Sequence, residues 1–177
     1  MICWGLFSAG SASGNSQGAD MKSLRQRAID GLQVGDSFTL SRTFSERDIQ
    51  DFARISRDYN PVHVDLPFAR LRQFSALVSH GLLTASLLTE IGGQIGWLGA
   101  GMDLRFKRPV YAGETITCRW TITAIDERGR ARAAIMMTNP EGRIVLEAET
   151  TGVIPGEAER ARLAAMVAEG DPSNGAG

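Results

Sequence analysis

The feature that most constrains the fold of this chain is a change in hydrophobic period near residue 100. Before it, residues 80–95 are apolar on nearly every side, which predicts a buried central helix. After it, apolar and polar residues alternate along residues 102–106, 116–122 and 131–135, with the period of two that is typical of strands. One buried helix followed by such segments predicts an α+β domain, with about five strands wrapped on the helix.

The remaining segments add elements on both sides of this helix. Ser45 is a good N-cap for a helix that ends near Ser56, because its hydroxyl can accept hydrogen bonds from the first turn. Asn60-Pro61 predicts a turn. The other predicted elements are a strand at 37–44, a short helix at 67–73, a strand at 144–154 and a surface helix at 157–168. Short turns join the last three strands, which should therefore form an antiparallel meander.

Chain length and the composition of the two ends divide the chain into three parts. The 177 residues are enough for one ordinary domain and too few for two. Residues 8–20 are Ser, Gly, Ala, Asn, Gln and Asp, which cannot form a core. We therefore expect a disordered leader over residues 1–30, a domain over residues 31–155, and a C-terminal helix with a flexible tail over residues 156–177.

Charge and cysteine content argue against several classes of partner and location. The net charge is −1 and both signs are mixed along the chain, so nucleic acid is not an expected partner. No apolar run approaches the roughly 20 residues of a membrane helix. Met1–Phe7 has no preceding Lys or Arg, unlike a signal peptide. Cys3 lies in the expected leader, so a disulfide with Cys118 is not expected, and a cytoplasmic protein is the default.

The segment Asp58-Tyr-Asn-Pro-Val-His63 is the first candidate for chemistry. Five residues on a helix give about 140° of rotation and an odd separation on a strand gives opposite faces, so only a turned loop brings Asp58 and His63 together. Pro61 has a fixed φ and pushes Asn60 out of the helical region, which makes such a loop rigid. A carboxylate and an imidazole there suit general acid–base catalysis. The alternative is a plain turn with a structural histidine.

The segment Ser79-His80-Gly81 begins the predicted central helix. A helix N-terminus has unpaired N–H groups and a positive dipole, and Gly81 lets a ligand approach the backbone closely. This arrangement could polarise a carbonyl group, as an oxyanion hole does. The alternative is that Ser79 is simply the N-cap of the helix.

Basic residues and potential metal ligands give weaker signals. Arg105-Phe-Lys-Arg-Pro109 could bind phosphates, although basic residues that alternate on a strand more often form its solvated face. The glycines between residues 92 and 101 fit no phosphate-loop spacing and predict a helix end and a loop. Two histidines and two distant cysteines predict no metal site.

Taken together, these segments resemble the MaoC-like, R-specific enoyl-CoA hydratase family. The resemblance rests on Asp58-Tyr-Asn-Pro-Val-His63, on His80-Gly81, and on Arg105-Phe-Lys-Arg-Pro-Val-Tyr-Ala-Gly-Glu114, and it covers roughly residues 32–155. The D-x-N-P-x-H element followed by H-G at this distance is specific. The resemblance implies a hot-dog fold, which is a curved antiparallel sheet around a long central helix, in a homodimer or higher homo-oligomer.

The resemblance also implies a reaction and the residues that perform it. The family adds water reversibly to trans-2-enoyl-CoA by syn hydration and forms R-3-hydroxyacyl-CoA, with no cofactor besides the thioester substrate. Asp58 and His63 would be the catalytic pair, and the Gly81 N–H would hold the thioester oxygen. The other substrate-binding residues would be Asn60, which shapes the loop, together with Ser79, His80 and Thr89.

The chain departs from the family pattern at two positions, and other functions remain open. Arg57 stands where Gly or an acidic residue is common, and Thr89 stands where close relatives often have Ser. The alternatives are a 3-hydroxyacyl-ACP dehydratase and a non-catalytic hot-dog subunit that binds acyl thioesters. A thioesterase is a further option, but the D-x-N-P-x-H loop followed by H-G fits hydratases better.

Overall fold

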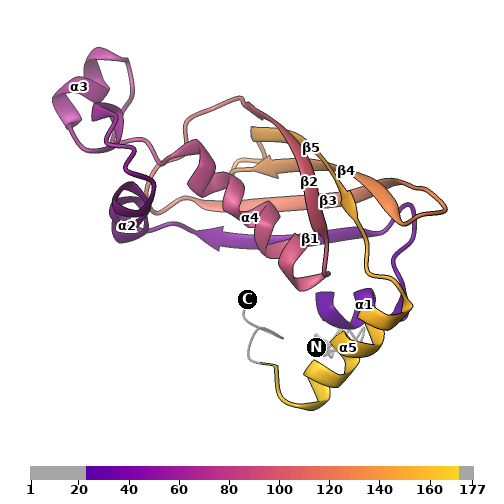
Figure 1. The fold of residues 1–177 in the computed structure, drawn as a ribbon. Coiled ribbons are helices and arrows are strands. Elements are labelled where there is room, and N and C mark those ends of the chain that lie inside the picture. Colours follow the sequence, from indigo (N-terminus) through magenta and orange to yellow (C-terminus); the bar gives the residue numbers. More distant parts are fainter. Residues whose placement is uncertain (1–22, 172–177) are drawn as a thin grey trace, which may run out of the picture.

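A computed structural model describes residues 23–171, which form one curved sheet with a long helix against it (Figure 1). Five antiparallel strands lie in the order β1-β3-β4-β5-β2. They span β1 Ser37–Thr43, β2 Leu98–Phe106, β3 Thr115–Ile125, β4 Arg130–Thr138 and β5 Ile144–Val153. The last three strands in sequence pair consecutively, so the predicted meander is confirmed.

The long helix is α4, Gly81–Gln94, and it packs on the sheet as the apolar segment predicts. The alternating residues predicted for β3 and β4 are buried in one core cluster with residues of α4: Ile116, Cys118, Trp120, Ile122, Ala131, Ala133 and Ile135 with Leu83, Leu87, Leu88 and Ile91. Burial raises the pKa of the Cys118 thiol to about 12. Leu82 is an exception to the predicted burial, with 59% of its surface exposed, because the first turn of α4 borders a cavity.

The N-terminal boundary of the domain lies earlier than the sequence predicts. Helix α1, Leu24–Asp30, falls within the expected leader, yet Ala28 is fully buried in the core. The reason is tertiary, since α1 packs against helix α5, Glu157–Ala168, which follows the whole sheet in sequence. Residues 1–22, with Cys3 and the rest of the predicted leader, and the predicted tail from residue 172 lie outside the described residues.

Between β1 and α4, three short helical elements follow one another. They are α2 Glu46–Ser56, the 3₁₀ helix η1 Pro61–His63, and α3 Leu66–Leu71. Ser45 caps α2 as predicted: its hydroxyl accepts from the Asp48 N–H, and the Asp48 carboxylate accepts from the Ser45 N–H. The Ser45 hydroxyl also donates to the Asp48 carboxylate, and this bond, together with the one from the Ser45 N–H, lowers the pKa of Asp48. The helix ends at Arg57, which has a left-handed backbone with φ of 59°.

Strand β2 differs from its prediction in length and burial. It begins at Leu98, inside the glycine-rich segment predicted to be a loop, and it contains a register shift between Gly99 and Gly101. Its apolar residues alternate, but every residue of β2 is exposed or only half-buried, because it is an outer strand of the sheet and pairs with β5. Within residues 23–171, the helices do not reach the length and apolar character needed to span a membrane.

Candidate active site

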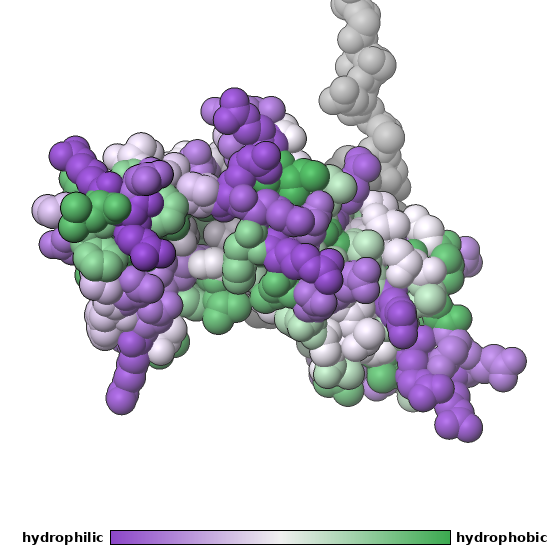
Figure 2. All heavy atoms as spheres, turned by 90° about the horizontal axis from the view of Figure 1, so that it is seen from above, coloured by the Kyte–Doolittle hydropathy of each residue, from purple (hydrophilic) through white to green (hydrophobic). Residues whose placement is uncertain are grey.

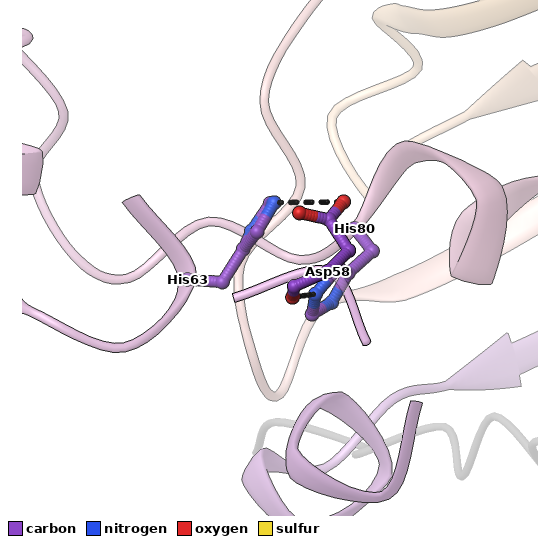
Figure 3. A group of neighbouring side chains, drawn as sticks. All are labelled: Asp58, His63 and His80. Carbon is purple, nitrogen blue, oxygen red and sulfur yellow. Dashed lines mark hydrogen bonds and ion pairs between the residues drawn. The ribbon is translucent and has the colours of Figure 1, made fainter. Parts of the chain in front are cut away.

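The loop after α2 brings Asp58 and His63 together, as the turn-forming sequence predicts (Figure 3). Oδ2 of Asp58 lies 3.9 Å from Nε2 of His63. Two short hydrogen-bonded turns shape the loop: Oδ1 of Asp58 accepts from the Asn60 N–H, and Oδ1 of Asn60 accepts from the Val62 N–H. Pro61 is the first residue of η1, and this single helical turn carries His63 back toward the carboxylate.

The orientation of His63 follows from a backbone contact. Its Nδ1 lies 2.6 Å from the carbonyl oxygen of Val78. A carbonyl oxygen only accepts hydrogen bonds, so Nδ1 carries the hydrogen, and in the neutral imidazole Nε2 then has the free lone pair. That atom faces Asp58. The His63 side chain is 10% exposed and the Asp58 side chain 53%, so a fixed imidazole meets an open carboxylate.

His80 lies directly beside this pair. It is the N-cap residue of α4, is 1% exposed, and stacks its ring on that of His63 with centroids 3.8 Å apart. Its Nε2 lies 2.9 Å from the main-chain carbonyl oxygen of Asp58, and must therefore donate to it. Burial lowers the pKa of His80, which favours the neutral ring.

The three side chains are close enough to raise the question of a metal site. Possible ligand atoms of Asp58, His63 and His80 lie within 4.8 Å of one another. However, an imidazole binds a metal in the plane of its ring, and the two rings are stacked at an interplanar angle of 24°. One ion cannot lie in both planes at bonding distance, which would be about 2.0–2.1 Å for zinc. The arrangement suits proton transfer better than metal binding.

A cavity of about 500 Å³ opens from the pair toward the N-terminus of α4. Gly81, Leu82 and Thr84 of the first helical turn line it, so the unpaired N–H groups of a helix start lie at its wall. The rest of the lining is mainly apolar: Phe52, Phe74, Val78, Phe106, Pro109, Val110, Val145 and Leu146. Such a cavity suits an apolar chain that carries a polar head group.

Of the other predicted site residues, Ser79 and His80 line the cavity, whereas Asn60 and Thr89 do not. Ser79 and His80 are buried and line the cavity; His80, rather than Ser79, is the N-cap. Asn60 uses its side chain to cap η1 and lies outside the cavity lining. Thr89 also lies outside it: it is exposed about two turns from Gly81, and its hydroxyl donates to the Ser86 carbonyl.

Two further cavity residues, Thr84 and Phe106, are not among those predicted from the sequence. The helical period could have indicated Thr84, since it follows Gly81 by three residues and therefore shares its helix face. It could not have indicated Phe106, because that residue comes from β2 and its ring carbon lies 2.6 Å from the position that a Cβ on Gly81 would occupy. Any side chain at residue 81 would therefore collide with the Phe106 ring unless that ring moved.

The basic segment around Phe106 is largely neutralised by acidic partners. Arg105 pairs with Asp103 at 3.1 Å, and Lys107 pairs with Glu147 at 2.8 Å. Arg108 donates to the carbonyl oxygen of Ile144. Lys107 and Arg108 nevertheless line the cavity. The segment is thus part of the cavity wall as well as a solvated face.

Comparison with known proteins decides the family. Residues 32–143 match the model of the MaoC like domain. The chain belongs to the MaoC-like family. The (R)-specific enoyl-CoA hydratase of Rhodospirillum rubrum is 31% identical over 131 residues, which cover 72% of this MaoC-like chain and 91% of the relative. The mitochondrial 3-hydroxyacyl-[acyl-carrier-protein] dehydratase of Arabidopsis thaliana is 31% identical over 130 residues, covering 70% of this chain and 78% of the relative.

A solved structure agrees with the family assignment. The unliganded R-hydratase PhaJ1 from Pseudomonas aeruginosa superposes with a TM-score of 0.67 and 31% identity, over 73% of this MaoC-like chain and 86% of that one. The predicted α+β hot-dog fold is thereby confirmed. The helix pair α1 and α5 lies outside the residues 32–143 that match the family model.

Proposed function

We propose that this MaoC-like protein is a hydro-lyase that reversibly adds water to trans-2-enoyl-CoA and forms R-3-hydroxyacyl-CoA. The observation that carries the proposal is the meeting of Asp58 and His63, with Nε2 of His63 facing the carboxylate, at the wall of a largely apolar cavity. The pair supplies the two proton-transfer groups that hydration needs. The similarity to the hydratase of Rhodospirillum rubrum supports the same reaction.

In the proposed mechanism, water lies between the two side chains. Asp58 as carboxylate takes one proton from the water while its oxygen bonds to C3 of the enoyl group. Protonated His63 gives the proton on Nε2 to C2, and the C2–C3 double bond becomes a single bond. Both groups act from one face, which gives syn addition. Proton transfer from Asp58 to His63 then restores the starting state, and no cofactor takes part.

The helix start would stabilise charge during this reaction. As C3 is attacked, negative charge develops on the thioester oxygen. An N–H at the start of α4, which we assign to Gly81, donates to this oxygen, and the helix dipole adds to the effect. The cavity wall around Gly81 includes Ser79 and Thr84, which we assign to substrate binding.

The alternative substrate is a thioester in which an acyl-carrier protein takes the place of coenzyme A. The Arabidopsis relative named for acyl-carrier-protein substrates is as similar as the hydratase, at 31% identity. The chemistry would be unchanged, since only the group beyond the thioester differs. Lys107 and Arg108 at the cavity wall could contact the phosphates of either substrate, although Lys107 already pairs with Glu147. A non-catalytic acyl-binding subunit would not need the oriented pair.

One assay tests the function and separates the alternatives. Purified protein is mixed with crotonyl-CoA, and loss of the enoyl chromophore is compared with release of free thiol. We expect chromophore loss without thiol release, and an R-3-hydroxybutyryl product. Thiol release would identify a thioesterase, and an inert mixture with both crotonyl-CoA and crotonyl-ACP would identify a non-catalytic subunit. Much faster turnover of crotonyl-ACP would favour the dehydratase.

We further propose that the protein is a homodimer or higher homo-oligomer in the cytoplasm. Strand β2 is an outer strand that exposes Leu98, Met102 and Phe106, and an unprotected edge of this kind favours pairing with another chain. Figure 2 shows further apolar surface at the end that carries α3, where Leu66, Phe68 and Leu71 are exposed. Light scattering at micromolar concentration should give at least twice the chain mass, and a monomeric mass would contradict the proposal.

A further inference from the structure

We propose that His80 is a positioning residue that holds Asp58 and His63 in their productive arrangement, rather than a ligand of the substrate. The inference rests on the proposed function, because it assigns a role in the same proton-transfer pair. It comes from two contacts that reach the two catalytic groups from one buried side chain (Figure 3).

The first contact fixes the backbone of Asp58. Nε2 of His80 donates to the Asp58 carbonyl oxygen at 2.9 Å, across 22 residues of sequence. Asp58 lies in an exposed loop, and its neighbours hold it only through short-range bonds from Asn60 N and to Ser56 Oγ. The far end of the loop is tied to the segment before α4 by contacts of Val62 and His63 with Val78. The His80 bond adds a long-range tie at Asp58 itself and joins it to the start of α4.

The second contact supports the His63 ring. The two imidazoles stack at 3.8 Å, and the Phe52 ring also packs against His80, with centroids 5.1 Å apart. The His63 ring is thus held by the Val78 carbonyl at its Nδ1 edge and by His80 at one face. A neutral His80, favoured by its burial, supports the ring without opposing a proton on His63.

The same contacts leave His80 poorly placed to bind a substrate. It is 1% exposed, one face meets His63, and its Nε2 is committed to the Asp58 carbonyl. The main chain of His80 begins α4, so the side chain links the loop directly to the element that carries Gly81. One residue thereby sets the position of the proton-transfer groups relative to the helix start.

Two substitutions separate the contacts. His80→Gln keeps an N–H donor near the position of Nε2 but removes the aromatic ring, whereas His80→Phe keeps a flat ring beside His63 but cannot donate. We expect His80→Phe to lower kcat at least about tenfold with KM within about threefold, because displaced groups slow chemistry more than binding. We expect His80→Gln to lose clearly less kcat than His80→Phe, because it keeps the tie to Asp58 although it loses the ring beside His63.

A second measurement does not depend on activity. Nitrogen-15 NMR of the histidine rings reports which nitrogen of His63 carries the hydrogen. We expect the wild type to carry a hydrogen on Nδ1 of His63, as the Val78 contact requires, and His80→Phe to show exchange-broadened His63 signals in a protein that still melts cooperatively.

The outcomes separate failure of this inference from failure of the proposed function. A wild type that hydrates neither crotonyl thioester overturns the function, while the NMR comparison still tests the positioning role. Unchanged His63 signals and unchanged kcat in His80→Phe overturn the positioning role. A rise in KM at constant kcat would also overturn it, because His80 would then be a substrate ligand. An equal loss of kcat in His80→Gln and His80→Phe would overturn it too, because the N–H donor that only Gln keeps would then have no effect on the rate.

Discussion

The two ends of α4 lie in the same core, but only the C-terminal end is closed by packing. At the C-terminal end, Trp97 and Trp120 pack edge to face with centroids 5.1 Å apart, and Gly96 lies against Pro155 and Leu163. At the N-terminal end, the helix begins at a cavity, and polar groups from the loop at residues 58–63 face it. One buried helix is thus sealed by packing at one end and open to a cavity at the other.

Two glycines show the difference most directly: Gly81, the first residue of α4 at the open end, and Gly152, which lies on β5 against Trp97 at the sealed end. A Cβ on Gly81 would lie 2.6 Å from the Phe106 ring, and Phe106 is 54% exposed, so the ring has room to move. A Cβ on Gly152 would lie 2.5 Å from the carbonyl oxygen of Leu98 and would also overlap the buried Trp97 indole, which cannot move freely. The same substitution should therefore affect rate at the open end and stability at the sealed end.

The largest effect is expected from removing the proton-transfer groups at the open end. Asp58→Asn and His63→Ala should each lower hydration turnover at least about a hundredfold, because each removes one positioned acid or base. Asp58 is largely exposed and His63 lies at the cavity wall, so both variants should melt close to the wild type. Kinetics with crotonyl-CoA and a thermal melt on the same preparations check this. Near-normal turnover in either variant would remove that residue from the mechanism.

A smaller loss of rate is expected from Gly81→Ala. The new methyl group must displace the Phe106 ring toward the cavity, so turnover should fall by about one to two orders of magnitude, below the cost of losing a whole oxyanion donor. The double variant Gly81→Ala with Phe106→Leu removes the ring that is displaced, and should recover most of the rate. Normal turnover together with a lowered melting temperature would instead mean that Gly81 is needed only for packing.

The sequence predicted the open end better than the sealed end. Local signals sufficed for the loop: Asn60-Pro61 and the capping Ser45 act within a few residues, and the meeting of Asp58 and His63 follows from them. The sealed end depends on contacts between distant segments, so Ala28 was assigned to a disordered leader although it is buried beneath α5.

Two positions in and near the site could not be predicted from local sequence for a similar reason. The family resemblance suggests Thr89 as a substrate-binding residue, but the helix places it on a different part of the surface from the cavity. Phe106 reaches Gly81 only because β2 pairs with β5 at the sheet edge, a pairing that alternation of residues cannot specify. Periodicity gives the type of an element and the buried side of a central strand, but not its neighbours in space.

A purely structural loss is expected at the sealed end. Gly152→Ala should lower the free energy of unfolding by about 1–3 kcal/mol, since the methyl group overpacks a site bounded by backbone and the Trp97 ring. Turnover per folded molecule should stay at the wild-type value, because Gly152 lies far along the sheet from the cavity lining. Denaturant unfolding and crotonyl-CoA kinetics measure the two quantities separately. A rate loss as large as that of Gly81→Ala would show that the packed end of α4 also affects catalysis, which would contradict the proposed difference between the two ends.

The smallest effect is a gain in stability beside the catalytic loop. Arg57 ends α2 with φ of 59°, a left-handed backbone that costs an L-residue about 1–2 kcal/mol and glycine much less. Part of that gain is offset, because glycine also has more freedom in the unfolded chain. Arg57→Gly should therefore raise the free energy of unfolding by about 0.5–1 kcal/mol. Arg57→Ala is the matched control, since it removes the charge but keeps the strained backbone, and it should give no gain. If Ala stabilised the protein as much as Gly, the cause would be the Arg57 charge next to the loop rather than the backbone strain at the end of α2.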